Sequence, residues 1–297
     1  MKMMKGEYRE ITPLDRDFPD KLRDIGSCPR VLYVRGCLPD PERPSVAIIG
    51  ARDGTDYGRD VARSFGRMLS QSGVDIISGM AYGIDAAGQW GAVDAGGKTF
   101  AVLGCGLNVC YPPSNYGLYE KLLECGGGAI SEHPLDTPPL GRHFASRNRI
   151  ISALADAVLV MEAKEMSGTS ITVSEALKQG KQVFALPGRI TDRLSAGCNR
   201  LIRDGAEALT SVEDVLEFLH LEHHHEQLLI EKRTELLSRS QKKIYSLLRE
   251  DSMHIDQVLK MSGMTLQEVL GTLMELEILG FSESPKSGYY RRKICKR

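Results

Sequence analysis

One short stretch of the sequence has the composition of an anion site. From Gly50 to Gly58 the chain reads GARDGTDYG, so an apolar run ends in glycine, one arginine follows, and a helical pattern begins directly afterwards. Backbone amides and the helix dipole attract anions at a helix N-terminus. Gly50, the amides that follow it and Arg52 therefore form a candidate phosphate site, for either a small nucleotide or a longer chain of phosphates.

A second stretch places an aromatic residue among cations. In GRHFASRNRII, Phe144 lies close in sequence to Arg142, Arg147 and Arg149. A flat ring beside positive charges suits a single-stranded nucleic acid, because a base stacks on the ring while the cations hold phosphates. A structural interpretation fits the same residues: Phe144 fills the core and Arg147 forms an ion pair. The residue types alone leave both interpretations open.

The elements that must position these residues alternate along the chain. Between Ser45 and about Leu219, apolar runs without polar alternation are separated by helical patterns. Such runs indicate strands buried on both faces, and the alternation predicts an α/β fold with a doubly wound parallel sheet. The expected strands are VAIIG, VDIIS, TFAVLG, GAISE, AVLVME and QVFALPG, and the expected helices span 57–72, 83–95, 116–125, 146–155 and 169–179.

The loops after these strands should meet at one edge of the sheet, which we call the rim: the edge at the carboxyl ends of the parallel strands. Nearly every such loop supplies Gly, Ser or Thr just before a helix. Several helix N-termini are therefore expected to open onto the rim. Ordinary turn chemistry would also favour these residues, but it does not require them at so many loops on one edge.

Composition narrows the possible classes of protein. The 297 residues have a formal net charge of −1, so any polyanion site must be local rather than a property of the whole surface. The start, MKMMKGEYRE, has no apolar segment of the signal-peptide type, and no apolar run approaches membrane-spanning length. Seven cysteines without a CxxC pair suggest reduced thiols in a cytoplasmic protein with no contact to a membrane. The triplet His223–His225 is expected to be solvated rather than a metal site.

Other nucleotide and catalytic motifs fit poorly. Gly50, Gly54 and Gly58 are spaced four apart, which is not the G-x-G-x-x-G of dinucleotide-binding proteins. GGKT at 96–99 lacks the earlier glycine of a P-loop and leads into a strand. EMSGTSITVSE lacks the leading Pro-Gly of the phosphoribohydrolase loop, and no G-x-S-x-G occurs. Asp85 is expected to cap its turn or pair with an arginine rather than act as a base.

The C-terminal region has a different pattern. Helical patterns at 240–249, 254–261 and 265–279 precede a hairpin with a basic end, which resembles a winged helix. The third helix, TLQEVLGTLMELEILG, has Glu268, Glu275 and Glu277 but no lysine or arginine. Acidic side chains fit a phosphate-lined groove poorly, so a protein-contact or dimer module is as well supported as a DNA-binding one.

Many blocks in order closely resemble one family. FPDKLRDIGSCPRVLYVRG, VAIIGAR, SGMAYGID, GKTFAVLGCGLNVCYPPSN, SEHP, FASRNRIIS, VMEAKEMSGTSIT and VFALPGRITDRLSAGCNRLIRDGA are similar to the bacterial DNA-processing protein A (DprA/Smf) family. The resemblance implies an extended Rossmann-like domain with a C-terminal winged helix, working as a homodimer. It also implies a function: protecting incoming single-stranded DNA during natural transformation and loading the recombinase RecA onto it.

The resemblance assigns roles to individual positions. The family's G-S/T-R phosphate loop corresponds to Gly50, Ala51 and Arg52, so Ala51 removes a hydroxyl donor while the amides and the arginine remain. The aromatic base contact corresponds to Phe144. Gly141 occupies the expected lysine position, so Arg142 is at best its replacement, and Gln89 stands where the family has histidine.

The expected protein is therefore a non-enzymatic, sequence-independent single-stranded DNA-binding protein without metal or cofactor. The predicted DNA-binding residues are Gly50, Arg52, Arg142, Phe144, Arg147 and Arg149, with Arg147 and Arg149 also open to structural roles. Four segments are expected: an N-terminal extension packing on the core (1–44), a Rossmann-like DNA-binding domain (45–220), a linker (221–238) and a winged-helix-like domain (239–297). The alternative is a nucleotide- or nucleoside-monophosphate-processing enzyme of phosphoribohydrolase-like fold.

Overall fold

The computed structural model describes residues 6–165, 167–221, 234, 237–249 and 251–292. The chain divides into two compact units, residues 1–221 and 222–297. Most of the predicted linker lies outside the described residues, as does the triplet His223–His225. Among the helices that the structure describes, none has the length and apolar character needed to cross a membrane.

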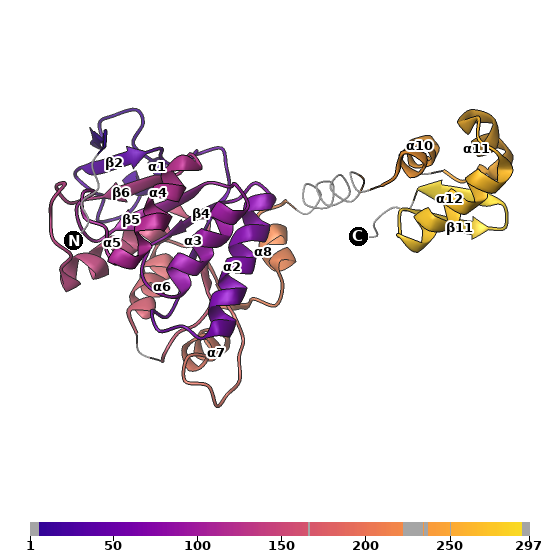
Figure 1. Ribbon diagram of the computed structural model, residues 1–297. Coiled ribbons are helices and arrows are strands. Elements are labelled where there is room, and N and C mark those ends of the chain that lie inside the picture. Colours follow the sequence, from indigo (N-terminus) through magenta and orange to yellow (C-terminus); the bar gives the residue numbers. More distant parts are fainter. Residues whose placement is uncertain (1–5, 166, 222–233, 235–236, 250, 293–297) are drawn as a thin grey trace. The chain divides into compact units, whose positions relative to one another are not determined.

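A nine-stranded sheet forms the centre of the first unit, in the order β1-β2-β6-β5-β4-β3-β7-β8-β9 (Figure 1). The strands from β6 across to β9 are parallel, whereas β2 is antiparallel to β6 and β1 to β2. Residues 1–44 are expected to pack on the core as an N-terminal extension, and the structure shows that they contribute β1 and β2 to the sheet itself. The strands are β1 (Arg9–Ile11), β2 (Leu32–Gly36), β3 (Ser45–Ile49), β4 (Asp75–Ser78), β5 (Thr99–Leu103), β6 (Gly128–Ser131), β7 (Ala157–Val160), β8 (Gln182–Ala185) and β9 (Glu207–Ala208).

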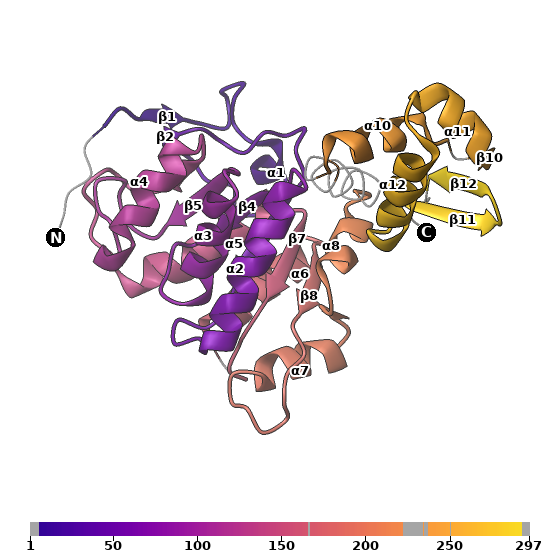
Figure 2. The same ribbon diagram turned by 45° about the vertical axis from the view of Figure 1, so that its right-hand side comes forward.

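Helices cover both faces of this sheet, and the sequence of β3 shows why (Figure 2). Val46 and Ile48 are buried in one core cluster and Ala47 and Ile49 in another, so the strand is apolar on both sides. One face carries α1 (Asp20–Arg23), α5 (Gly141–Leu154), α6 (Gly168–Lys178) and α7 (Ala196–Arg203). The other carries α2 (Asp56–Gln71), α3 (Ile84–Asp94), α4 (Tyr116–Glu124), which follows the short helix η1 (Pro113–Asn115), and α8 (Val212–Phe218).

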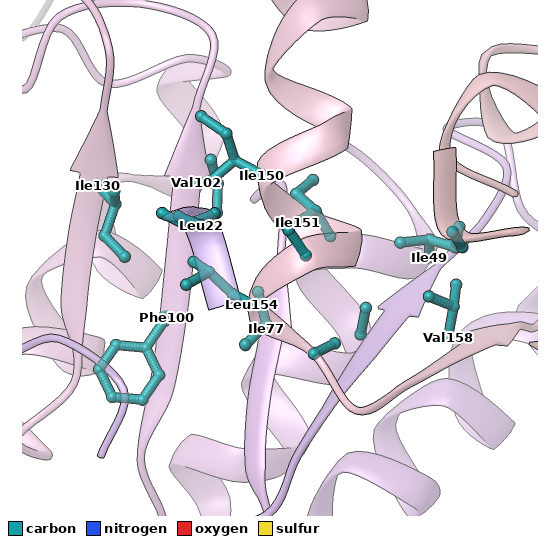
Figure 3. Close-up of a cluster of buried hydrophobic side chains, with 14 of the residues drawn as sticks. Leu22, Ile49, Ile77, Phe100, Val102, Ile130, Ile150, Ile151, Leu154 and Val158 are labelled. Atoms are coloured by element: carbon teal, nitrogen blue, oxygen red, sulfur yellow. The ribbon is translucent and has the colours of Figure 1, made fainter. Parts of the chain in front are cut away.

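Helix α5 sits across the middle of its face and positions part of the rim. Its C-terminal half directs Ile150, Ile151 and Leu154 into the core beside Val102 and Ile77 of the sheet (Figure 3). The apolar end of the helix is therefore fixed by packing, which holds its polar N-terminal half at the rim.

The doubly wound fold is confirmed, with one correction to the helix limits that affects the site. The helix predicted from residue 146 begins at Gly141, so Arg142 and Phe144 lie on its first turn rather than in a loop. The position before the helix is Leu140, which makes no side-chain cap hydrogen bond. The usual start signal of Ser, Thr, Asp or Asn is therefore missing from the sequence.

The second unit has its own small core. It contains α10 (Arg239–Leu247), β10 (Met253–His254), α11 (Ile255–Ser262), α12 (Leu266–Ile278), β11 (Ser282–Lys286) and β12 (Tyr289–Arg292), with β12 between β10 and β11. Ile244, Val258, Leu273 and Phe281 are among the buried residues that join the three helices to the hairpin. Three helices followed by a β-hairpin confirm the predicted winged-helix arrangement.

Candidate nucleic-acid interface

The strand order reverses between β3 and β7, because β3 to β6 extend toward one edge of the sheet and β7 to β9 toward the other. In parallel α/β sheets, a crevice opens where the loops after two such strands diverge. Here a pocket of about 410 Å³ lies at this point. Its lining includes Arg52 after β3, Ala81 after β4, Phe144 of α5, and Gly168 and Thr169 at the start of α6.

Glu162 fastens the loop after β3 in place. This residue follows β7, is 5% exposed, and accepts hydrogen bonds from the Thr55 amide (2.8 Å) and from the Thr55 hydroxyl (2.5 Å). Its own carbonyl accepts from the Ala51 amide at 2.8 Å. Gly58 leaves room for the carboxylate, since a Cβ there would clash with the Glu162 carboxyl group. Glu162 is not among the residues predicted for the site. The sequence gives one indication of it, which is that the apolar run AVLVME ends in an acidic residue.

These bonds decide which groups of the predicted phosphate loop are available. The Ala51 and Thr55 amides both donate to Glu162, so Ala51, whose side chain is buried, has no donor left for a phosphate. Lys164 forms an ion pair with Asp53 at 2.6 Å, and this contact holds the pKa of the Asp53 carboxyl below its ordinary value. Arg52 is exposed and has no ion pair within the described parts of the chain. It is therefore the available cation of this loop.

Phe144 lies beside Arg52. The Arg52 guanidinium carbon is 5.5 Å from the centre of the Phe144 ring, and the Tyr111 ring is 5.3 Å away. The ring also packs on the strand end at Gly104, where a Cβ would come within 2.6 Å of its Cδ1. Phe144 is half-buried, so its position is fixed while part of the ring borders the pocket.

Arg147 is buried beneath this ring. It is 4% exposed, and its guanidinium donates to the carbonyl oxygens of Gly79 (2.8 Å) and Val102. Burial lowers the pKa of Arg147 to about 10, and the nearby Asp85 carboxylate acts in the opposite direction. Asp85 accepts from the Gly79 amide at 3.1 Å, and burial raises its pKa. Arg147 and Asp85 thus bind the carbonyl and the amide of the same residue, Gly79, beneath the pocket, without forming an ion pair with each other.

The other two arginines of the motif differ from each other. Arg149 donates to both carboxylate oxygens of Glu132, at 2.6 and 2.5 Å, and to Ser27 at 2.9 Å. Its charge is therefore compensated. Arg142 is exposed, and the structure gives it no ion pair among the residues it describes. The candidate interface thus contains two uncompensated cations from the predicted set, Arg52 and Arg142.

Gln89 lies outside the pocket. This residue, which stands where the resembled family has histidine, is fully buried and donates to Thr99 (3.1 Å) and to the Phe100 carbonyl (3.2 Å). This position serves the packing of α3 on β5 and does not reach the rim. No group of three potential metal-ligating side chains occurs among the described residues.

Comparison with known proteins decides the family. The model of the family described as DNA recombination-mediator protein A matches residues 9–220, and that of the DprA winged helix domain matches residues 231–284. The chain belongs to the DprA family. This finding confirms the resemblance predicted from the sequence, for both units of the chain.

Individual DprA relatives agree with this assignment. Protein Smf of Escherichia coli is 36% identical over 292 residues, covering 96% of this chain and 78% of that protein. The X-ray structure of DprA from Streptococcus pneumoniae has a TM-score of 0.66 and 39% identity, covering 71% of this chain and 74% of that one. A structure of DprA from Helicobacter pylori has a TM-score of 0.63 and 28% identity, covering 72% and 95%. The Helicobacter protein is described as having a unique single-stranded DNA binding mode.

Proposed function

We propose that this protein binds single-stranded DNA without sequence preference at the rim pocket, has no catalytic activity, and acts in the cytoplasm as a mediator of RecA during natural transformation or recombination. The observation that carries the proposal is the placement of the uncompensated Arg52 5.5 Å from the half-buried ring of Phe144. A phosphate partner and a stacking surface are the two groups that a single strand requires side by side.

The roles of the predicted residues follow from their surroundings. Arg52 holds a phosphate, Gly50 lines the pocket beside it, and Phe144 stacks a base. Arg142 adds positive charge from the exposed side of α5. Arg147 and Arg149 act indirectly in this proposal: Arg147 supports the ring from below, and Arg149 fixes α5 to the loop of Glu132.

The state of Asp53 and of the thiols near the pocket supports a binding rather than a catalytic role. Asp53 is paired with Lys164. Burial raises the pKa of the Cys105 thiol to about 12 and that of Cys110 to about 11, so neither is a nucleophilic thiolate at neutral pH. A monophosphate-processing enzyme would need a general acid or base at this site, and Asp85, which lines the pocket and whose pKa is raised by burial, is the candidate for that role that the AMP test below examines.

The direct test compares the two candidate ligands. Labelled oligo-dT and AMP are each mixed with the purified full-length chain. We expect binding of the oligonucleotide and no turnover of AMP. Turnover of AMP without oligonucleotide binding would replace this proposal with the enzymatic alternative.

The mediator role and the homodimer need their own measurements. RecA filament formation on single strands pre-coated with a single-strand-binding protein should be faster in the presence of this chain. Sedimentation should give a mass near twice that of one chain. A chain that binds oligo-dT but leaves filament formation unchanged would keep the DNA-binding proposal and remove the mediator role.

A further inference from the structure

A second aromatic side chain on the rim has no partner of its own. Tyr82 lies in the turn between β4 and α3 and is 46% exposed. Across the described chain it has no hydrogen bond, ion pair or ring contact. Ala81, its immediate neighbour, lines the same pocket as Phe144 and Arg52. Since consecutive Cα atoms are about 3.8 Å apart, Tyr82 stands at the margin of the proposed DNA site.

The turn that carries Tyr82 is held on both sides of the ring. Before it, Met80 is fully buried with a φ of 52°, and the Asn115 amide donates to the carbonyls of Met80 (3.0 Å) and Ala81 (3.3 Å). After it, Gly83 has a φ of 75°, a conformation that L-residues with a Cβ rarely adopt. An exposed ring on a fixed backbone loses little conformational freedom when it gains a partner.

The same turn packs directly on the phosphate loop. The Ile84 amide donates to the Ala51 carbonyl at 3.3 Å, and a Cβ on Gly83 would lie 2.6 Å from the Arg52 carbonyl oxygen. Arg52 therefore contacts two aromatic-bearing segments: its backbone meets the Tyr82 turn, and its guanidinium lies over Phe144. A phosphate held by Arg52 would lie next to Phe144 and close to the turn that carries Tyr82.

We propose that Tyr82 is a second base-stacking platform, which takes the base of a nucleotide next to the one stacked on Phe144. This inference rests on the proposed function and adds a second nucleotide to the site. Because every base presents a flat face, stacking on two rings lengthens the bound strand without introducing sequence preference.

The test uses affinity for oligo-dT with the full chain. Tyr82→Ala should weaken binding about tenfold while leaving the salt dependence unchanged, because stacking does not release counterions. Tyr82→Phe keeps the ring and should bind as the wild type. The matched control is Tyr8→Ala, which removes a tyrosine of similar exposure (42%) just before the edge strand β1 and should have no effect.

An oligonucleotide of abasic sugar phosphates separates stacking from a structural effect. On this ligand Tyr82→Ala should bind as well as the wild type, since there is no base to stack. An equal loss on abasic and dT ligands, or a lowered melting temperature, would overturn the stacking role. If the wild type binds oligo-dT and Tyr82→Ala binds it equally well, the second platform is wrong and the DNA-binding proposal stands. If the wild type binds no oligonucleotide, both proposals fall.

Discussion

The rim of the first unit and the C-terminal winged helix differ in how their acidic side chains lie relative to their cations. At the rim, Arg52 and Arg142 are exposed, and neither has a carboxylate partner among the described residues. In the second unit, Arg291 pairs with Glu283 at 2.6 Å, Lys286 lies over Tyr289, and Arg292 lies over Tyr245. A ring contact does not neutralise a cation, as Arg52 over Phe144 shows, so only Arg291 of these three is compensated within the described chain. The difference lies in the carboxylates: the two rim cations pair with none that the structure describes, whereas the hairpin places Glu283 against Arg291.

Helix α12 extends this contrast. It occupies the place of a recognition helix, yet its charged residues are acidic, and Met274 and Ile278 are 62% and 86% exposed. Phosphates would be repelled by the glutamates, whereas exposed apolar side chains favour contact with another protein. A winged-helix fold therefore does not by itself identify the DNA-binding surface, because function depends on which side chains are exposed and uncompensated.

The largest expected effect concerns the support of the rim. Arg147→Ala should lower the free energy of unfolding of the first unit by about 3–5 kcal/mol, because the carbonyls of Gly79 and Val102 would lose two hydrogen bonds from a buried charged donor. Chemical denaturation measures this loss. Arg142→Ala, on the exposed side of the same helix, is the matched control and should stay within about 0.5 kcal/mol of the wild type. Unchanged stability with a flatter salt dependence of binding would make Arg147 a direct phosphate contact.

The next effect tests the stacking surface. Phe144→Ala should cost about 1–3 kcal/mol of oligo-dT binding without changing the salt dependence. Phe144→Leu retains apolar packing on Gly104 and Tyr111 but removes the flat ring. It should therefore keep the melting temperature near that of the wild type while binding stays weak. Wild-type affinity in Phe144→Leu would indicate that the residue only fills space.

A smaller, salt-dependent effect tests the phosphate contact. Arg52→Ala should reduce the slope of log affinity against log salt by about 0.7 for each phosphate of a single strand that the variant no longer neutralises. Arg52→Lys keeps the charge and should keep the slope. Affinities measured at several salt concentrations distinguish the two variants. A slope unchanged in Arg52→Ala would remove Arg52 from the phosphate site, and an equal slope change in Phe144→Ala would contradict the division of roles.

The smallest effect is expected from the winged helix. Removing the residues after Ser238 should leave oligo-dT affinity within about tenfold, or 1.4 kcal/mol, of the full chain, because α12 has no cation to offer. Titration of both forms with the same oligonucleotide measures the difference. A loss greater than tenfold would make the second unit a principal DNA contact and reverse the comparison between the two regions.

The sequence by itself determined the parallel strands β3 to β8 and the rim at their carboxyl ends. Apolar runs such as VAIIG are typical of central parallel strands, and their alternation with helical patterns leaves few possible topologies. Ordered motifs also identified the family. These features depend on local pattern and on short-range order along the chain, which can be read directly from the residues.

Only the tertiary structure decided which arginines of GRHFASRNRII are available. Arg142, Arg147 and Arg149 are alike in type and close in sequence, but one is exposed, one is buried and bonded to the Gly79 and Val102 carbonyls, and one is paired with Glu132. The partners of Arg147 and Arg149 come from segments distant in the chain, as does Glu162, which binds the loop predicted to hold phosphate. Whether a charge is free depends on these long-range contacts, and no local pattern contains that information.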